Sequence, residues 1–196
     1  MSELKKFVDI TGTALMEEDA YLAGCFARHQ SPLAAQPFGI LWRVDERYYQ
    51  VIALRRLLLY FPRPVAIERD SFDFNVWPNA QAAGYSDVGE MKRFMDPRGD
   101  ADIPKICRDI HKIYDCGLPG FVILISANQP AQTGANIDWL TGKLDDEWSA
   151  GRLKRRMEHR TEPFRFRSVD KNGDVEVWVL GMLVETTAAS AEPATP

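Results

Sequence analysis

Cysteine and histidine are both scarce in this chain of 196 residues, which has three of each. Cys25, Cys107 and Cys116 form an odd, widely spaced set, so the sequence indicates neither a disulfide framework nor a zinc site. The histidines are scattered, and none lies beside a serine or cysteine in a nucleophile motif. We therefore expect reduced thiols, no metal and no cofactor.

Long apolar runs and an excess of positive charge are also lacking. No stretch approaches the roughly 20 apolar residues that span a bilayer, and residues 1–7 turn polar before any signal core forms. The formal charge of −4 disfavours a dedicated nucleic-acid binder but leaves room for local basic patches. We expect a cytoplasmic protein that does not enter a membrane.

What the chain does contain is typical of a globular domain, with 45% hydrophobic and 27% charged residues. Its length suits one substantial core and is short for two. We predict a single domain over residues 1–187. Residues 188–196 are small and polar with two prolines, and we expect them to form a disordered tail.

The strongest element is the run from Gly120 to Asn128. Five consecutive large apolar residues, 121–125, lie between a Pro-Gly turn and an amide-rich loop. Such a short, β-branched run is typical of a strand buried on both faces. We place it, near 121–127, at the centre of the sheet.

Helical spacing of apolar residues recurs along the chain. The 46–61 segment is apolar nearly all round, which predicts a central, well-covered helix. The other helices are expected at about 13–29 with Thr13 as cap, from Ser86 or Asp87 through Met95, at 103–115 and from Asn136 onward. Beyond Gly151 we expect either a kink or a second helix.

Extended segments are expected at 38–44 and from Val65 to Trp77. Asn172-Gly173 is a strong turn signal between 164–170 and 175–187. With Asn172-Gly173 as a two-residue loop, Phe166 would face Val179 and Arg167 would face Trp178 in a cation–π contact. Together these elements predict an α+β (mixed α/β) fold. It would have a central mixed sheet and a C-terminal β-hairpin, packed by four to six helices.

An arginine-rich surface supports our preferred function. The segment 152–160 holds five basic side chains and one acidic one, and exposed tryptophan and arginine are typical interface anchors. We expect a non-catalytic accessory or regulatory protein that binds an acidic protein partner; nucleic acid is a less favoured partner. The proposed partner-binding residues are Arg152, Arg155, Arg156, Arg160, Arg165, Arg167 and Trp178. Solvated surface arginines are the competing interpretation.

The loop 128–136 supports the alternative, an enzyme or sensor with a polar small-molecule pocket. It follows the central strand, where binding loops often lie, and carries Asn128, Gln129, Thr133 and Asn136. It matches neither a P-loop nor a dinucleotide fingerprint. The competing interpretation is a connection whose side chains only satisfy their own backbone.

Arg55 and Arg56 are anomalous on an apolar helix, because buried arginine needs an anionic partner. We expect Glu68, Asp70 or Asp73 to hold at least one of them; a bound anionic ligand is the alternative. Glu68 and Asp70 would also share one face of a strand, a pattern that suggests a metal-dependent nuclease. We disfavour that chemistry because no lysine lies nearby in sequence.

Overall fold

The computed structural model describes residues 2–29, 46–94, 102–129, 132–154, 157–170 and 173–184. The predicted strand at 38–44 and the predicted tail at 188–196 lie outside these ranges. Within them the chain forms four helices and seven strands, in the order α1-α2-β1-β2-β3-α3-β4-α4-β5-β6-β7. No helix among these residues combines the length and apolarity needed to cross a membrane.

The strands form one mixed sheet in the order β1-β2-β3-β4-β7, and β5 and β6 both pair with the outer edge of β7. β3 and β4 are parallel, and every other pair is antiparallel. The strands are β1 Val65–Arg69, β2 Phe72–Val76, β3 Asp87–Phe94, β4 Gly120–Asn128, β5 Met157–Arg160, β6 Phe164–Asp170 and β7 Gly173–Val184.

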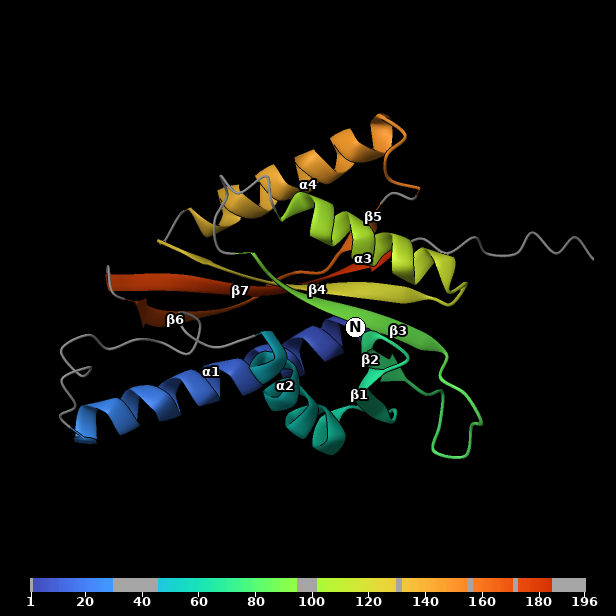
Figure 1. Ribbon diagram of the computed structural model, residues 1–196. Coiled ribbons are helices and arrows are strands. Elements are labelled where there is room, and N and C mark those ends of the chain that lie inside the picture. Colours follow the sequence, from blue (N-terminus) through green and yellow to red (C-terminus); the bar gives the residue numbers. More distant parts are fainter. Residues whose placement is uncertain are drawn as a thin grey trace, which may run out of the picture.

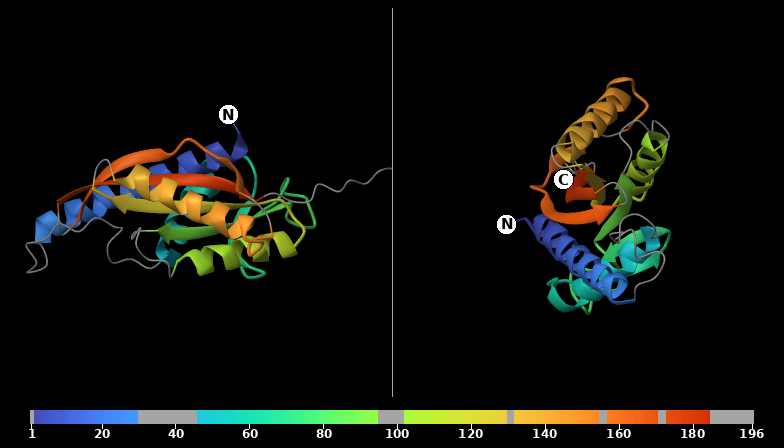
Figure 2. Two further views of the ribbon diagram at one scale, coloured as in Figure 1. Left: turned by 90° about the horizontal axis from the view of Figure 1, so that it is seen from above. Right: turned by 90° about the vertical axis from the view of Figure 1, so that its left-hand side faces the viewer.

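Two pairs of helices cover the two faces of this sheet, so the molecule has three layers (Figures 1 and 2). α1 (Glu3–His29) and α2 (Glu46–Tyr60) lie on one face, and α3 (Ile103–Asp115) and α4 (Thr133–Ser149) lie on the other. Each layer boundary holds its own apolar core. The fold class predicted from the sequence is confirmed.

β4 is buried on both faces, as its sequence predicts. Phe121, Ile123 and Ile125 belong to the core beneath α1 and α2, while Val122 and Leu124 belong to the core beneath α3 and α4. Because successive side chains of a strand point to opposite faces, one apolar run supplies both cores. β4 therefore contributes side chains to both apolar cores.

The predicted break near Gly12 is wrong, because α1 runs unbroken from Glu3 to His29. The ring of Phe164 lies 2.3 Å from the position that a Cβ on Gly12 would occupy. Glycine is therefore required by close packing of the helix on β6, and it does not end the helix. Thr13 caps nothing; its hydroxyl donates a 2.7 Å bond to the carbonyl of Asp9.

The helix predicted through Met95 is also wrong, since Asp87–Phe94 forms β3. Val88 and Met91 have helical spacing, but they face the two opposite cores of the sheet. β3 is hydrogen-bonded to a strand on each side, and this tertiary pairing outweighs a short local pattern. Similarly, Met157 begins β5 where the sequence predicted a kink or a second helix.

The C-terminal hairpin forms, with its register shifted by two residues from the prediction. Asp170 pairs with Gly173, so the two-residue loop is 171–172, which lies outside the described residues. Arg165, and not Arg167, consequently faces Trp178. A shift of two keeps every side chain on its expected face, which is why the pattern alone could not reveal it.

The environment of α2 differs from its prediction. The helix forms over the expected residues, but it lies on the outside of its layer and buries only one side. Ile52 and Leu57 enter the core, whereas Leu58, Leu59 and Tyr60 are exposed. The expected central, covered helix is therefore a peripheral helix with an uncovered apolar side.

Candidate functional site

The arginines predicted to bind a partner do not form one surface. Arg152 makes a bidentate ion pair with Glu147 at 2.6 and 2.8 Å, just beyond the C-terminal end of α4. Arg160 pairs with Asp138 at 3.0 Å. Arg155 and Arg156 lie outside the described residues.

The two arginines of β6 lie near the other end of α4. Arg165 stacks over Trp178 at 4.0 Å from the ring centroid, and that ring also packs against Gly134 in the first turn of α4. Arg167 is exposed opposite Glu176. Since α4 has 17 residues, roughly 25 Å of helix separates this pair from Arg152.

The amide loop bonds largely to neighbouring backbone. The Asn128 side chain accepts from the backbone N–H of Gln129 at 2.7 Å, and the buried Thr133 hydroxyl donates to the carbonyl of Glu176 at 3.0 Å. Asn136 is buried within α4, which begins at Thr133, so it is not the predicted cap. Its Nδ2 has no partner among the described residues.

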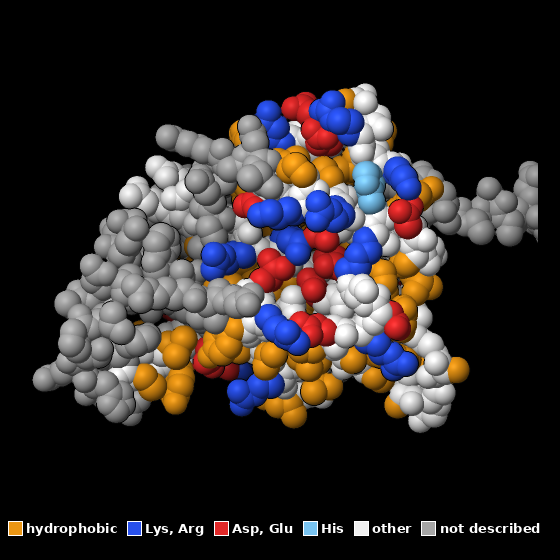
Figure 3. Space-filling model, viewed as in Figure 1, with side chains coloured by type: hydrophobic (Ala, Val, Ile, Leu, Met, Phe, Trp, Pro, Cys, Tyr) orange, Lys and Arg blue, Asp and Glu red, His pale blue; other side chains and the backbone are white. Residues whose placement is uncertain are grey.

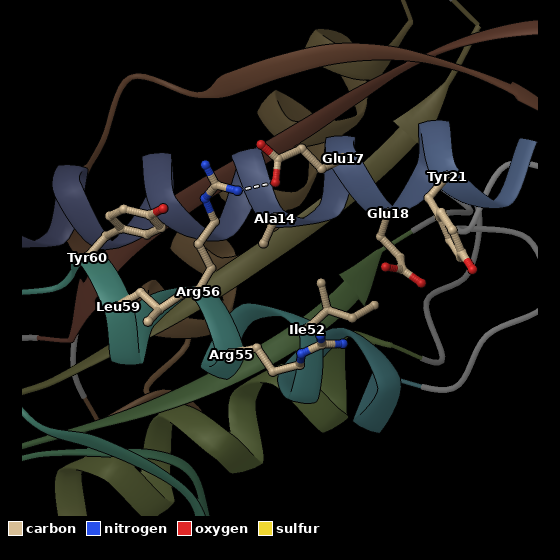
Figure 4. Close-up of a pocket in the computed structure, with 9 residues that line it drawn as sticks. All are labelled: Ala14, Glu17, Glu18, Tyr21, Ile52, Arg55, Arg56, Leu59 and Tyr60. Atoms are coloured by element: carbon tan, nitrogen blue, oxygen red, sulfur yellow. Dashed lines mark hydrogen bonds and ion pairs between the residues drawn. The ribbon is translucent and has the colours of Figure 1, made fainter. Parts of the chain in front are cut away.

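Arg55 and Arg56 do not have the predicted partners. Arg56 pairs with Glu17 of α1, because α2 packs along α1 there. Glu68 instead pairs with Arg47, and Asp70 lies beside Arg69. Arg55 is exposed, as Figure 4 shows at the edge of a groove between the two helices.

A different group of side chains forms the most polar interior region, which we call the charged cluster. It lies where β2 and β3 meet α3, and a mixed group of acidic and basic side chains is visible beneath α3 near the middle of Figure 3. The charged cluster consists of Glu46, Asp73, Glu90, Lys92, Asp109 and Lys112.

Two carboxylates of the charged cluster lie beside each other where the pairing of β2 with β3 ends. The register ends with Phe74 opposite Gly89, and Asp73 and Glu90 are the next residues on the two strands. Asp73 Oδ2 accepts the backbone N–H of Met91 at 2.7 Å, and its negative charge acts on Glu90. Glu90 is only 2% exposed, which removes the water that would weaken the repulsion.

The pKa of Glu90 reflects its burial and the charges around it. Burial raises the pKa, the negative charge of Asp73 raises it further, and Lys112 opposes both through a hydrogen bond and its charge. The result is a Glu90 pKa of about 8. A single lysine therefore does not offset burial and the neighbouring negative charge, and the balance favours the protonated form of Glu90.

Lys92 projects from β3 on the same side as Glu90, two residues further along. Its Nζ lies 2.9 Å from Glu46 Oε1 and 3.1 Å from Asp109 Oδ2. Burial acts to lower the pKa of Lys92, but these two carboxylates outweigh it and the pKa is raised. Lys92 is thus a fixed cation, unsuited to act as a general base.

The residues of the charged cluster fit a divalent cation of the magnesium type. Among the described residues, no three Asp, Glu, His or Cys side chains are grouped as a complete metal site. Magnesium does not require one, because it is usually held by one or two carboxylates together with water and substrate phosphates. Asp73 and Glu90 are two such carboxylates; Lys112 already pairs with Glu90 and the Met91 N–H with Asp73, so a divalent cation would have to take the place of the Lys112 ammonium.

A second groove, between α3 and α4, contains a cysteine and a histidine, but these residues are not arranged as a reactive nucleophilic pair. Cys107 and His111 both line it. Burial raises the pKa of the Cys107 thiol to about 11, so little thiolate forms near neutral pH. His111 Nε2 already accepts the backbone N–H of Lys154 at 3.3 Å.

Glu68 and Asp70, the carboxylates that suggested a disfavoured metal-dependent nuclease, lie at the β1–β2 turn with positive φ angles of 53° and 52°. They pair with Arg47 and Arg69 and do not belong to the charged cluster. Glu90 and Lys92 were assigned to a helix, where positions two apart point to nearly opposite sides. The signal that could have found them is the strand alternation of 88–94.

Comparison with protein-family models, with curated proteins and with solved structures finds no match.

Proposed function

We propose that this protein hydrolyses phosphodiesters with the help of a divalent cation held by Asp73 and Glu90. The observation that carries the proposal is the negative charge of Asp73 acting on the buried Glu90, with the fixed cation Lys92 beside them. A second negative charge beside a buried carboxylate costs stability, and a bound cation would offset that repulsion. A cation there supplies Lewis-acid stabilisation of negative charge on a phosphate.

Lys92 has the complementary role of an electrostatic stabiliser. In hydrolysis, water adds to phosphorus, the ester P–O bond breaks and the leaving oxygen takes a proton, while negative charge grows on the phosphoryl oxygens. A preorganised cation at that point lowers the barrier without having to reorient. Glu46 and Asp109 hold the Lys92 ammonium in place and keep it charged.

The exposed side of α3 favours a polyanionic substrate, such as a nucleic-acid backbone. Lys105, Arg108 and Lys112 recur at three- and four-residue steps, so they follow one side of the helix. Lys105 and Arg108 are exposed, and Lys112 reaches Glu90 in the charged cluster. A row of cations that leads to paired carboxylates suits phosphates that continue beyond the scissile bond.

The test is cleavage of labelled single- and double-stranded DNA and RNA in the presence of magnesium or manganese, with a chelator as the blank. We expect Asp73→Asn, Glu90→Gln and Lys92→Met each to lower the rate by about 10²-fold or more, as removal of a transition-state contact does. Glu68→Gln and Asp70→Asn make the same chemical change outside the charged cluster and should leave the rate unchanged. Circular dichroism checks the fold of each variant.

Wild-type protein that cleaves none of these substrates, or equal cleavage by Asp73→Asn, would contradict the proposal. The partner-binding function expected from the sequence would then be the better candidate. One observation favours it, the stack of Arg165 on Trp178 beside the exposed Arg167. That function requires neither Asp73 nor Glu90.

A further inference from the structure

A groove of approximately 380 Å³ runs between α1 and α2 (Figure 4), the two helices on the opposite face of the sheet from α3 and α4 (Figure 1). Glu17, Glu18 and Tyr21 of α1 form one rim, and Arg55, Leu59 and Tyr60 of α2 form the other. The groove is independent of the proposed hydrolytic site.

The rims of the groove expose an unusual amount of apolar side chain. Leu59 is 75% exposed, Tyr21 is 61% exposed, and Leu58 and Tyr60 lie next to Leu59 with similar exposure. Single exposed apolar residues are ordinary, but a contiguous group on two helices is typical of a surface that another molecule covers.

The charges of the groove are divided between its two helices. Glu17 and Arg56 neutralise each other within the chain. Glu18 accepts a hydrogen bond from the Tyr48 hydroxyl, and Arg55 has no ion pair within the described part of the chain. One negative group on α1 and one positive group on α2 thus remain, one on each rim of the groove (Figure 4).

We propose that the groove is the interface of a homodimer with a two-fold axis. In such an interface a contact from residue i to residue j is repeated from j to i. Arg55 of each copy would then meet Glu18 of the other, giving two equal ion pairs around a centre formed by Tyr21, Leu59 and Tyr60. An acidic partner would be repelled by Glu18 and a basic one by Arg55, whereas a second copy complements both.

The test is the solution mass, measured by light scattering and sedimentation over a range of concentrations. We expect a dimer of twice the 22.2 kDa chain mass. Leu59→Arg changes an exposed side chain, so the fold should survive while the dimer dissociates. Arg55→Glu and Glu18→Arg should each weaken the dimer by about tenfold or more in Kd, since each places like charges together. Arg55→Glu combined with Glu18→Arg should restore it.

The matched control is Arg167→Glu, the same charge reversal on the exposed edge strand β6, which should leave the dimer intact. A protein that is monomeric at every concentration would overturn the proposal and assign the groove to a different molecule. A dimer that withstands Leu59→Arg, or a charge exchange that does not restore association, would also overturn it. Thermal melts of each variant separate lost association from lost folding.

Discussion

The charged cluster and the α1–α2 groove depart from the usual distribution of residues in opposite ways. At the first, the buried carboxylate of Glu90 is grouped with partly buried carboxylates and lysines between β2, β3 and α3. At the second, leucine and tyrosine side chains face solvent. Neither arrangement favours stability. Burying charge costs free energy, and leaving apolar side chains in solvent loses the stabilisation that their burial would give. Each region is therefore best explained by something that occupies it.

The two regions differ in how the isolated chain can relieve that cost. A buried carboxylate can take up a proton, so the cost at Glu90 depends on pH and on competing cations. An exposed leucine has no such route, and only coverage by another surface removes it from water. The charged cluster should respond to pH and metal, and the groove to protein concentration.

The largest effect on stability is expected within α2, where neighbouring leucines have opposite environments. Leu57 is completely buried and Leu58 is 61% exposed. Leu57→Ala should lower the free energy of unfolding by ~2–5 kcal/mol, because it leaves a cavity in the core. Leu58→Ala makes the same chemical change at the surface and should stay within about 0.5 kcal/mol. Urea denaturation of both variants measures the contrast, and equal losses would place Leu58 in a covered environment.

The same helix shows what the sequence could and could not predict. The apolar residues of 46–61 predict a helix, which is correct, but they cannot distinguish a helix covered by its own chain from one covered by another molecule. Both need apolar residues on every side. The central strand was predictable because its run has neither the length of a helix nor any polar interruption.

The sequence did not predict the candidate site because residues 86–95 were expected to form a helix, whereas Asp87–Phe94 forms a strand. As a helix, 86–95 separates Glu90 from Lys92; as a strand, it places them on one face, with Asp73 beside Glu90. Strand identity here is set by pairing with β2 and with β4, whose paired residues lie 11 to 15 and 32 positions away. Local spacing contains no information on such partners, so the carboxylate pair could not be assembled from it.

A second effect, which depends on pH, is expected from the titration of Glu90. The folded-state pKa, about 8, is raised above the ordinary value of 4.5, so the folded protein binds more protons than the unfolded chain between these values. The free energy of unfolding should therefore fall as pH rises through this window. Glu90→Gln carries no titrating charge and should lack this component.

The measurement is urea denaturation of wild type and Glu90→Gln at several pH values from 5 to 8. Other titrating groups are shared by the two proteins, so their contributions cancel in the difference. The variant should gain relative stability steadily as pH rises. Parallel curves for the two proteins would show that Glu90 has an ordinary pKa and that the charged cluster is not under electrostatic stress. Glu68→Gln, at the exposed β1–β2 turn, serves as the control and should parallel the wild type.

The smallest effect is expected from magnesium, which competes with the Glu90 proton for the same carboxylates. At ten times its Kd, a ligand that binds only the folded state raises the free energy of unfolding by about 1.4 kcal/mol. Metal binding requires deprotonated ligands, so the gain should be larger at pH 8 than at pH 6. Thermal melts of the wild type with magnesium chloride, compared with sodium chloride at equal ionic strength, separate binding from screening. Asp73→Asn and Glu90→Gln should lose the gain, and Glu68→Gln should keep it. An equal gain in all four proteins would mean that magnesium acts elsewhere on the surface, leaving the carboxylate pair to the proton alone.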